Sequence, residues 1–246
     1  MASVLVTGGN RGIGFGLVKE FLKDMKYITV VATTRCIPKS TELRAIKDPR
    51  LHVVELDALS DESITVASDK VEQILGNSGL DVLVNNAGVF IPYDLNGKAD
   101  RTKFRDNFEV NVVGALIITQ VFLPLLRKAK SGKIVNISSF VASLSQSLGS
   151  VPGKDYTPYS MSKARLHSYF PTTALNQMTT SLAIDLKDQP ITIISLDPGW
   201  VQTDMGGMDA TITVEQSASS LVSSIARATK LESGGFFDRD LKLLPY

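Results

Sequence analysis

The chain has no excess of charge of either sign. Its 246 residues include 26 lysines and arginines against 25 aspartates and glutamates, for a net charge of +1 at pH 7. Proteins that bind nucleic acid or anionic membranes usually carry strongly basic surfaces. The balance therefore argues against both as partners and favours a small-molecule ligand.

Cysteine and histidine are nearly absent. Cys36 is the single cysteine, so no intrachain disulfide can form, and a reducing compartment is the expected environment. The two histidines, His52 and His167, have no partner at the spacing of metal ligands, so no metal site is predicted.

Long hydrophobic runs are missing as well. The longest, Val112 to Leu126, contains Thr119, Gln120 and Pro124. It is shorter than the ~20 residues that a membrane-spanning helix needs. The first strand begins almost at once, and nothing before it resembles a secretory signal. We therefore expect a cytoplasmic protein without a membrane segment.

What the chain does have, at its start, is a glycine-rich turn. The apolar run Val4 to Val6 leads into a turn with Gly8, Gly12 and Gly14, and apolar residues at helical spacing follow. Glycine lets the main chain approach a ligand closely, so N–H groups at a helix start can hold a pyrophosphate. The spacing is T-G-x-x-x-G-x-G rather than the common G-x-G-x-x-G. A dinucleotide site is predicted, and a turn without a ligand is the alternative.

Further apolar, β-branched runs alternate with helical patterns along the whole chain. Such runs are typical of parallel strands buried on both faces. The expected strands are Ile28 to Ala32, Leu51 to Leu56, Val82 to Val84, Lys133 to Ile137, Ile191 to Leu196 and an edge strand at Gly235 to Phe237. The pattern predicts an α/β fold, a single doubly wound, Rossmann-like parallel sheet with helices on both faces, as one domain over residues 1–246.

The end of the second strand bears on cofactor choice. An NAD-specific site would place a carboxylate there for the ribose 2′-OH, about 20 residues beyond the glycines. This chain has Thr34 and Arg35 instead. Arg35, with Arg11 of the glycine turn, can neutralise a 2′-phosphate, so NADP(H) is the expected cofactor. Asp57, which follows the third strand, is expected either to meet the adenine amino group or only to stabilise its turn.

A long helix is expected from about Asp100 to Leu126, with Leu116 and Phe122 on its buried face. Asn111 lies in its middle. An asparagine at such a position competes with its own backbone for hydrogen bonds and is usually unfavourable. A functional role for Asn111 is therefore predicted.

Tyr159 and Lys163 are four residues apart, which places them on one face of a helix. A free phenol titrates near ~10, whereas a useful acid at neutral pH needs a pKa nearer ~7, a gap worth about 4 kcal/mol. One ammonium ~4 Å away supplies about that much at an effective dielectric constant near 20. The pair can therefore act as a proton donor to a carbonyl, and a solvated surface pair is the alternative.

The order of these motifs is that of a known family. It runs from the glycine turn through Asn85-Asn86-Ala87-Gly88, Ser139, Tyr159-x-x-x-Lys163 and Pro198-Gly199. Over nearly its whole length the chain resembles the short-chain dehydrogenase/reductase family. Asn-Arg-Gly-Ile-Gly at 10–14 and the segments 198–207, 213–216 and 234–237 are most similar to the sniffer group of carbonyl reductases.

The resemblance implies roles for individual residues. Tyr159 would donate the proton, and Lys163 would lower its pKa and hold the nicotinamide ribose. Ser139 would hydrogen-bond the substrate oxygen, and Asn111 would fix a water that links Lys163 to solvent. The family takes the second serine of the pair, and Ser138 and Ser139 point opposite ways. The further implied cofactor-binding residues are Asn10, Ile13, Asn85, Ala87, Gly88, Pro198, Gly199, Val201 and Thr203. The helix bearing Tyr159 and Lys163 supplies the family's usual subunit interface, so the resemblance allows a homodimer.

Two departures from the family pattern stand out. The spacing from Ser139 to Tyr159 is longer than usual, and extra residues occur around Arg165 to Thr173, including Pro171. A proline inside a helix costs ~3 kcal/mol or more, so the helix bearing Tyr159 is expected to kink or end before Pro171. Tyr156 is a weaker candidate acid, because the residue four positions later is Ser160.

The predicted function is NADPH-dependent reduction of a small-molecule carbonyl, in an aldehyde, ketone or quinone. Phe140, Val141, Tyr156 and Trp200 are expected to line an apolar substrate pocket. The main alternative is a regulatory or scaffold protein that binds NADPH with little or no turnover, supported by the segment around Pro171. A sugar-nucleotide epimerase is disfavoured, because little chain remains after Pro198 to build a substrate domain.

Overall fold

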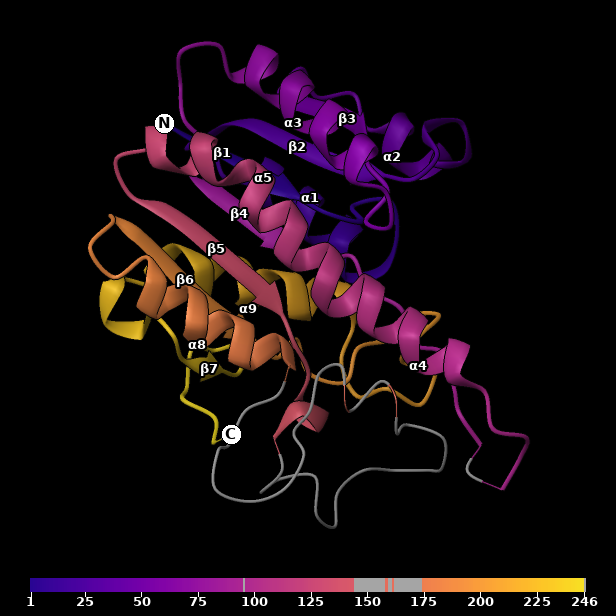
Figure 1. The fold of residues 1–246 in the computed structure, drawn as a ribbon. Helices are drawn as coiled ribbons and strands as arrows, with labels where there is room; N and C mark the ends of the chain where they lie inside the picture. The colour runs from indigo at the N-terminus through magenta and orange to yellow at the C-terminus, as the bar shows by residue number, and fades with distance from the viewer. Residues whose placement is uncertain (95, 144–157, 159–160, 162–173, 246) are drawn as a thin grey trace.

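The computed structural model describes residues 1–94, 96–143, 158, 161 and 174–245. Their strands form one parallel sheet of seven, in the order β3-β2-β1-β4-β5-β6-β7 (Figure 1). The strands are β1 (Ala2–Val6), β2 (Tyr27–Thr34), β3 (Leu51–Glu55), β4 (Val82–Asn85), β5 (Gly132–Ile137), β6 (Ile191–Leu196) and β7 (Phe236–Phe237). The prediction of a doubly wound parallel sheet is confirmed, including β7 at its edge.

Helices cover both faces of this sheet (Figure 1). One face packs against α1 (Gly12–Lys23) and α9 (Val214–Arg227). The other packs against α3 (Asp61–Leu75) and α5 (Ala115–Lys128), with α8 (Ala174–Asp185) over β6. The shorter elements are η1 (Ile37–Lys39), α2 (Thr41–Ala45), α4 (Arg101–Phe108), η2 (Glu109–Gly114), η3 (Phe140–Ala142) and η4 (Lys230–Glu232).

The strands are buried on both sides because their side chains alternate between two apolar layers. In β1, Val4 and Val6 belong to the layer beneath α1 and α9, while Leu5 belongs to the layer beneath α3 and α5. All three are fully buried. This two-sided burial is why the strands read as continuous apolar runs.

The long helix predicted from Asp100 to Leu126 forms as α4, the π-helical segment η2 and α5. Phe122 is fully buried as expected, but the expectation for Leu116 is wrong, because its side chain is 37% exposed. A π-helical turn holds more residues than an α-helical turn and so rotates the faces that follow it. Ile118 and Thr119 take the inward position in α5.

Among the described residues, the segment Arg101–Lys128 is long and apolar enough to cross a membrane by length and composition alone. In this fold α5 packs on the sheet, with Phe122 and Leu126 in the core beside α3. Core helices of this kind meet the same two criteria as membrane spans.

Candidate functional site

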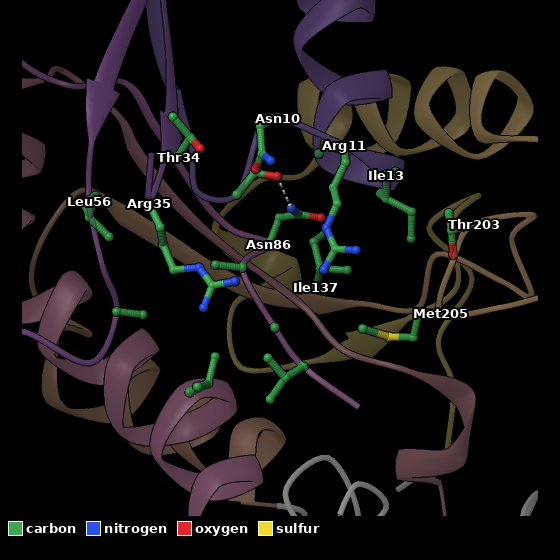
Figure 2. A pocket seen from close by; sticks show the side chains of 18 of the residues that line it. Asn10, Arg11, Ile13, Thr34, Arg35, Leu56, Asn86, Ile137, Thr203 and Met205 are labelled. Carbon is green, nitrogen blue, oxygen red and sulfur yellow. Dashed lines mark hydrogen bonds between the residues drawn. The ribbon is translucent and has the colours of Figure 1, made fainter. Parts of the chain in front are cut away.

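A cavity of about 350 Å³ opens at the carboxyl ends of the central strands, where open α/β sheets bind their ligands (Figure 2). The glycine turn, the ends of β2 and β5, the turns after β3 and β4, and the loop after β6 form its wall. Twelve predicted cofactor-binding residues line it: Gly8, Asn10, Arg11, Gly12, Ile13, Gly14, Arg35, Asp57, Ala87, Gly88, Pro198 and Thr203.

The glycine turn needs glycine for two different reasons. Gly8 and Gly12 have φ angles of +64° and +53°, a left-handed backbone that other residues rarely adopt. Gly14 has no space for a side chain, because a Cβ there would overlap the Gly8 carbonyl oxygen and the Asn86 side-chain nitrogen. The main chain of the turn therefore forms the cavity wall directly.

The turn after β4 is tied to the glycine turn by hydrogen bonds. The Asn86 side-chain amide donates to the Thr7 carbonyl at 2.8 Å. It also donates to the Gly8 carbonyl at 3.3 Å (Figure 2). The backbone N–H groups of Asn86 and Ala87 both donate to Thr7 Oγ1 at 3.0 Å. Asn86, which our sequence analysis did not select, thus joins two walls of the cavity.

The cavity carries basic side chains beside the end of β2. Arg35 and Lys39 line it. The residue that ends β2 is Thr34, not a carboxylate, and its hydroxyl bonds Ser40 Oγ at 2.8 Å. Arg11 lies on the side of the cavity where Thr203 is found (Figure 2). It forms an ion pair there with Asp204 at 3.0 Å. The positive charge beside the end of β2 therefore comes from Arg35 and Lys39.

Asp57 has a visible structural role. Its Oδ1 accepts from the Leu59 backbone N–H at 3.0 Å, and its own N–H donates to Ser63 Oγ at 3.0 Å. The carboxylate thus stabilises the turn while it lines the cavity. A contact with adenine stays a prediction.

Asn85 lies in the sheet rather than on the cavity wall. Its side-chain amide donates to Thr119 of α5 and to Asn136 of β5, both at 2.9 Å, and Asn136 in turn donates to Thr179 of α8 at 2.8 Å. This buried polar row holds α5 and α8 onto the strands. Val201 is 3% exposed and pairs with Ile212. Three of the described residues predicted to bind the cofactor therefore do not line the cavity: Asn85, Gly199 and Val201.

The asparagine in the long helix bonds outside its own helix. Asn111 Oδ1 accepts from the Val89 N–H at 2.8 Å, and its side-chain nitrogen donates to the Val89 carbonyl at 2.9 Å. It lies in the π-helical segment η2 and is 1% exposed. Asn111 thereby holds the loop that follows Gly88, and its predicted link to a water and Lys163 stays a prediction.

The two serines after β5 have different surroundings. Ser138 is 3% exposed, and its hydroxyl donates to Asn176 Oδ1 of α8 at 2.8 Å. Ser139 is the N-cap residue of η3 and is only half-buried. Ser138 lines the cavity, whereas Ser139 is not among its lining residues, so the predicted contact of Ser139 with a substrate stays a prediction.

The loop after β6 closes over the cavity near the glycine turn. Gly199 has a φ angle of +80°, which the tight Pro198-Gly199 turn requires. A Cβ on Gly12 would lie 3.4 Å from the Thr203 Cγ2 atom. Thr203 is therefore close to the glycine turn, and its predicted contact with a bound dinucleotide stays a prediction.

Tyr159, Lys163, Tyr156 and the segment around Pro171 lie outside the described residues. Their predicted roles stay predictions. The turn that precedes the Tyr159 region in the chain, η3, is described and lies beside the cavity residue Ser138.

Asp197, the residue between β6 and Pro198, is a buried carboxyl that sequence reasoning did not select. It is 8% exposed, and burial raises its pKa to about 6. The unfolded carboxyl titrates near 3.8, so the native state holds a proton through the window from about pH 4 to 6. The protonated form of Asp197 therefore stabilises the native state at low pH, and this contribution to the free energy of unfolding is lost as the pH rises from about 4 to 6. Asp197 could have been selected from the sequence, because it is an acidic residue directly after an apolar strand.

Comparisons with known proteins agree with this geometry. The short chain dehydrogenase family matches residues 2–211. An NADPH-bound carbonyl reductase from chicken fatty liver superposes with a TM-score of 0.90 at 32% identity, covering 100% of this chain and 94% of that one. The carbonyl reductase Sniffer of Drosophila melanogaster superposes with a TM-score of 0.89 at 32% identity over the full length of both chains.

Sequence relatives agree as well. An uncharacterised oxidoreductase of Schizosaccharomyces pombe is 30% identical over 98% of this chain and 96% of its own length. A short-chain dehydrogenase of Penicillium roqueforti is 31% identical over 94% of this chain and 91% of its own. With a family match over most of its length and a cavity at the glycine turn, the chain belongs to the short chain dehydrogenase family of oxidoreductases.

Proposed function

We propose that this protein is an NADPH-dependent reductase of aldehydes, ketones or quinones. The observation that carries the proposal is the cavity itself, with main-chain glycines at one end and Arg35 and Lys39 at the other. The absence of room for a Cβ at Gly14 fits a pyrophosphate held by backbone N–H groups. The 32%-identical chicken carbonyl reductase is NADPH-bound, which supports the same cofactor here.

The chain's own groups then have defined tasks. A bound nicotinamide supplies the hydride that reaches the carbonyl carbon. Tyr159 gives its phenolic proton to the carbonyl oxygen, and Ser139 donates a hydrogen bond to the same oxygen as negative charge develops there. Lys163 favours loss of the Tyr159 proton. Asn111 holds the loop after Gly88 in place.

The substrate is expected to be largely apolar. Trp200 and Met205 are 38% and 46% exposed on the loop that follows β6, and Met205 lines the cavity. The Trp200 ring nitrogen donates to the Gly206 carbonyl at 2.7 Å, which fixes the indole on this loop. Phe140, Val141 and Trp200, which were predicted to line an apolar pocket, do not line this cavity. The apolar Met205 does, and it favours apolar carbonyl compounds.

The direct test combines binding with turnover. Purified protein is titrated with NADPH and then given a panel of quinones, aldehydes and ketones while loss of cofactor absorbance is followed. We expect tight NADPH binding and turnover of apolar members of the panel. Tight binding without turnover of any member would instead favour the scaffold alternative.

Reversing the charge of Arg35 is expected to weaken use of NADPH but not of NADH. Hydrogen bonds to a charged group contribute about 1.5–3 kcal/mol, so Arg35→Glu should raise the KM for NADPH about 10- to 100-fold. The KM for NADH should change less than about threefold, because NADH has no 2′-phosphate. Arg44→Glu is the matched control, since Arg44 is exposed on α2 and does not line the cavity. Equal effects of Arg35→Glu on both cofactors would contradict the assignment.

The two serines make a second matched pair. Ser139→Ala is expected to lower kcat by about 10²- to 10³-fold, the usual effect of losing one donor to a developing oxyanion. Ser138→Ala removes the bond to Asn176 and should cost about 1 kcal/mol of stability while kcat changes little. Steady-state kinetics and thermal unfolding of both variants separate the two roles. The opposite pattern would assign the substrate contact to Ser138.

A further inference from the structure

A buried carboxylate joins two turns that border the cavity. Asp197 Oδ1 accepts from the Phe140 backbone N–H at 2.8 Å, and the nearby Gly199 backbone N–H helps to stabilise the charged form of this carboxyl. Phe140 directly follows Ser139, and Gly199 belongs to the turn that begins at Pro198. A single side chain thus connects the turn after β5 with the turn after β6.

Both turns have hydrogen bonds of their own that make them stiff. In η3, Ala142 donates to the Ser139 carbonyl at 2.8 Å and Ser143 donates to the Phe140 carbonyl at 2.9 Å. In the other turn, Ser217 of α9 donates to the Pro198 carbonyl at 2.8 Å. Because each turn is stiff, a link between them sets the distance from Ser139 to Pro198.

Asp197 sits in a fixed and poorly solvated position. Its backbone N–H donates to the Phe237 carbonyl at 2.8 Å, which anchors it to β7. In the described part of the chain, the charged groups that act on it are Asp238, which disfavours its ionisation, and Arg239, which favours it. The α9 helix contributes the uncharged Ser217 to this region.

We propose that Asp197 is a positioning residue, whose carboxylate holds the Ser139 turn and the Pro198-Gly199 turn at the spacing that carbonyl reduction requires. The inference rests on the proposed function, because Ser139 acts on substrate and Pro198 lies over the cofactor cavity. Misplacement of a reacting group by 1 Å can cost about 100-fold in rate. Asp197 touches neither substrate nor cofactor and acts through these two turns.

The role has a pH signature. A carboxylate accepts stronger hydrogen bonds from backbone N–H groups than a neutral carboxyl does. Burial raises the pKa of Asp197 to about 6, so the link between the turns weakens as the pH falls through 6. In the wild-type protein kcat is therefore expected to fall below about pH 6.

Three variants separate positioning from stability. Asp197→Ala removes the hydrogen bond from Phe140 and the interaction with the Gly199 N–H, and we expect a 10- to 100-fold loss of kcat with an aldehyde while the Kd for NADPH stays within about threefold. Asp197→Asn keeps an acceptor oxygen, so the variant should retain most of its kcat at pH 7. Because an amide does not titrate, the kcat of this variant should not fall below pH 6 as that of the wild type does. Asp100→Ala is the control, because that carboxylate also accepts a backbone N–H bond, from Thr102 at 2.9 Å, and is not among the charged groups that act on Asp197.

A measurement without substrate tests the link directly. In the wild-type protein the amide proton shifts of Phe140 and Gly199 should titrate with a common midpoint near pH 6, and in Asp197→Asn they should not. If they do not titrate together in the wild type, the link is overturned. If Asp197→Ala has a kcat within twofold of wild type, the positioning role is overturned. If the wild type reduces no carbonyl compound, the proposed function and the positioning role both fall, and the amide titration still decides whether the link exists.

Discussion

Replacing Tyr159 with phenylalanine is expected to lower carbonyl reduction by about 10³-fold, within the 10²- to 10⁴-fold range of general acid catalysis. The change removes one oxygen and keeps the ring, so the Kd for NADPH should stay within about threefold of the wild-type value. Stopped-flow absorbance with a quinone or an aldehyde measures the chemical step, and quenching of protein fluorescence measures binding. Loss of turnover with intact binding would identify the phenol as the proton donor.

Tyr156→Phe is the matched control for this experiment. The residue four positions after Tyr156 is Ser160, so no ammonium is expected one helical turn away to lower its pKa. We expect Tyr156→Phe to keep kcat within about tenfold of wild type. If Tyr159→Phe keeps wild-type turnover while Tyr156→Phe loses it, the acid has been assigned to the wrong tyrosine.

The sheet could be predicted because its strands are buried on both faces. A strand such as β6, in which every residue from Ile191 to Leu196 is buried, gives a continuous apolar run that is easy to recognise. The boundaries were less accurate, since β2 extends over Tyr27–Thr34 rather than Ile28 to Ala32. The five-residue helix α2 (Thr41–Ala45) was missed, because so short a segment has too few turns to show a helical period.

The site could be predicted where main-chain geometry dictates the residue. A left-handed backbone or a close contact requires glycine at three positions of the turn, which are Gly8, Gly12 and Gly14. All three line the cavity, as predicted. Side-chain direction was harder to infer. Whether Asn85 or Asn86 reaches the cavity depends on where β4 ends, and β4 ends at Asn85, whose side chain stays in the sheet.

Long-range polar contacts could not be predicted at all. The ion pair of Arg11 with Asp204 and the hydrogen bond from Phe140 to Asp197 join residues far apart in the sequence. Neither partner carries a local signal of the contact, since an arginine or an aspartate in a loop is usually solvated. Such contacts follow from the fold and become visible only once the strands are in order.

Replacing Gly14 with alanine is expected to weaken NADPH binding by at least about 100-fold, comparable to the loss that a 1 Å displacement of positioned groups can cause. The added Cβ would overlap the Gly8 carbonyl oxygen and the Asn86 side-chain nitrogen. Backbone cannot move aside as a side chain can, so the glycine turn must open. The N–H groups at the start of α1 then lose their alignment on the pyrophosphate.

Gly16→Ala is the matched control, because it lies in the same helix and is also tightly packed. Its added Cβ would lie 2.5 Å from the Val214 Cγ1 atom and 3.2 Å from the Ala218 Cβ atom, where α1 packs on α9. Both variants gain up to about 1 kcal/mol of helix propensity and both crowd their surroundings, so thermal unfolding alone does not distinguish them. NADPH affinity distinguishes them, because only the Cβ added at Gly14 would overlap the backbone of the glycine turn. Equal affinities in the two variants would place the dinucleotide away from the Gly8 to Gly14 turn, whereas a loss confined to Gly14→Ala ties binding to main-chain geometry.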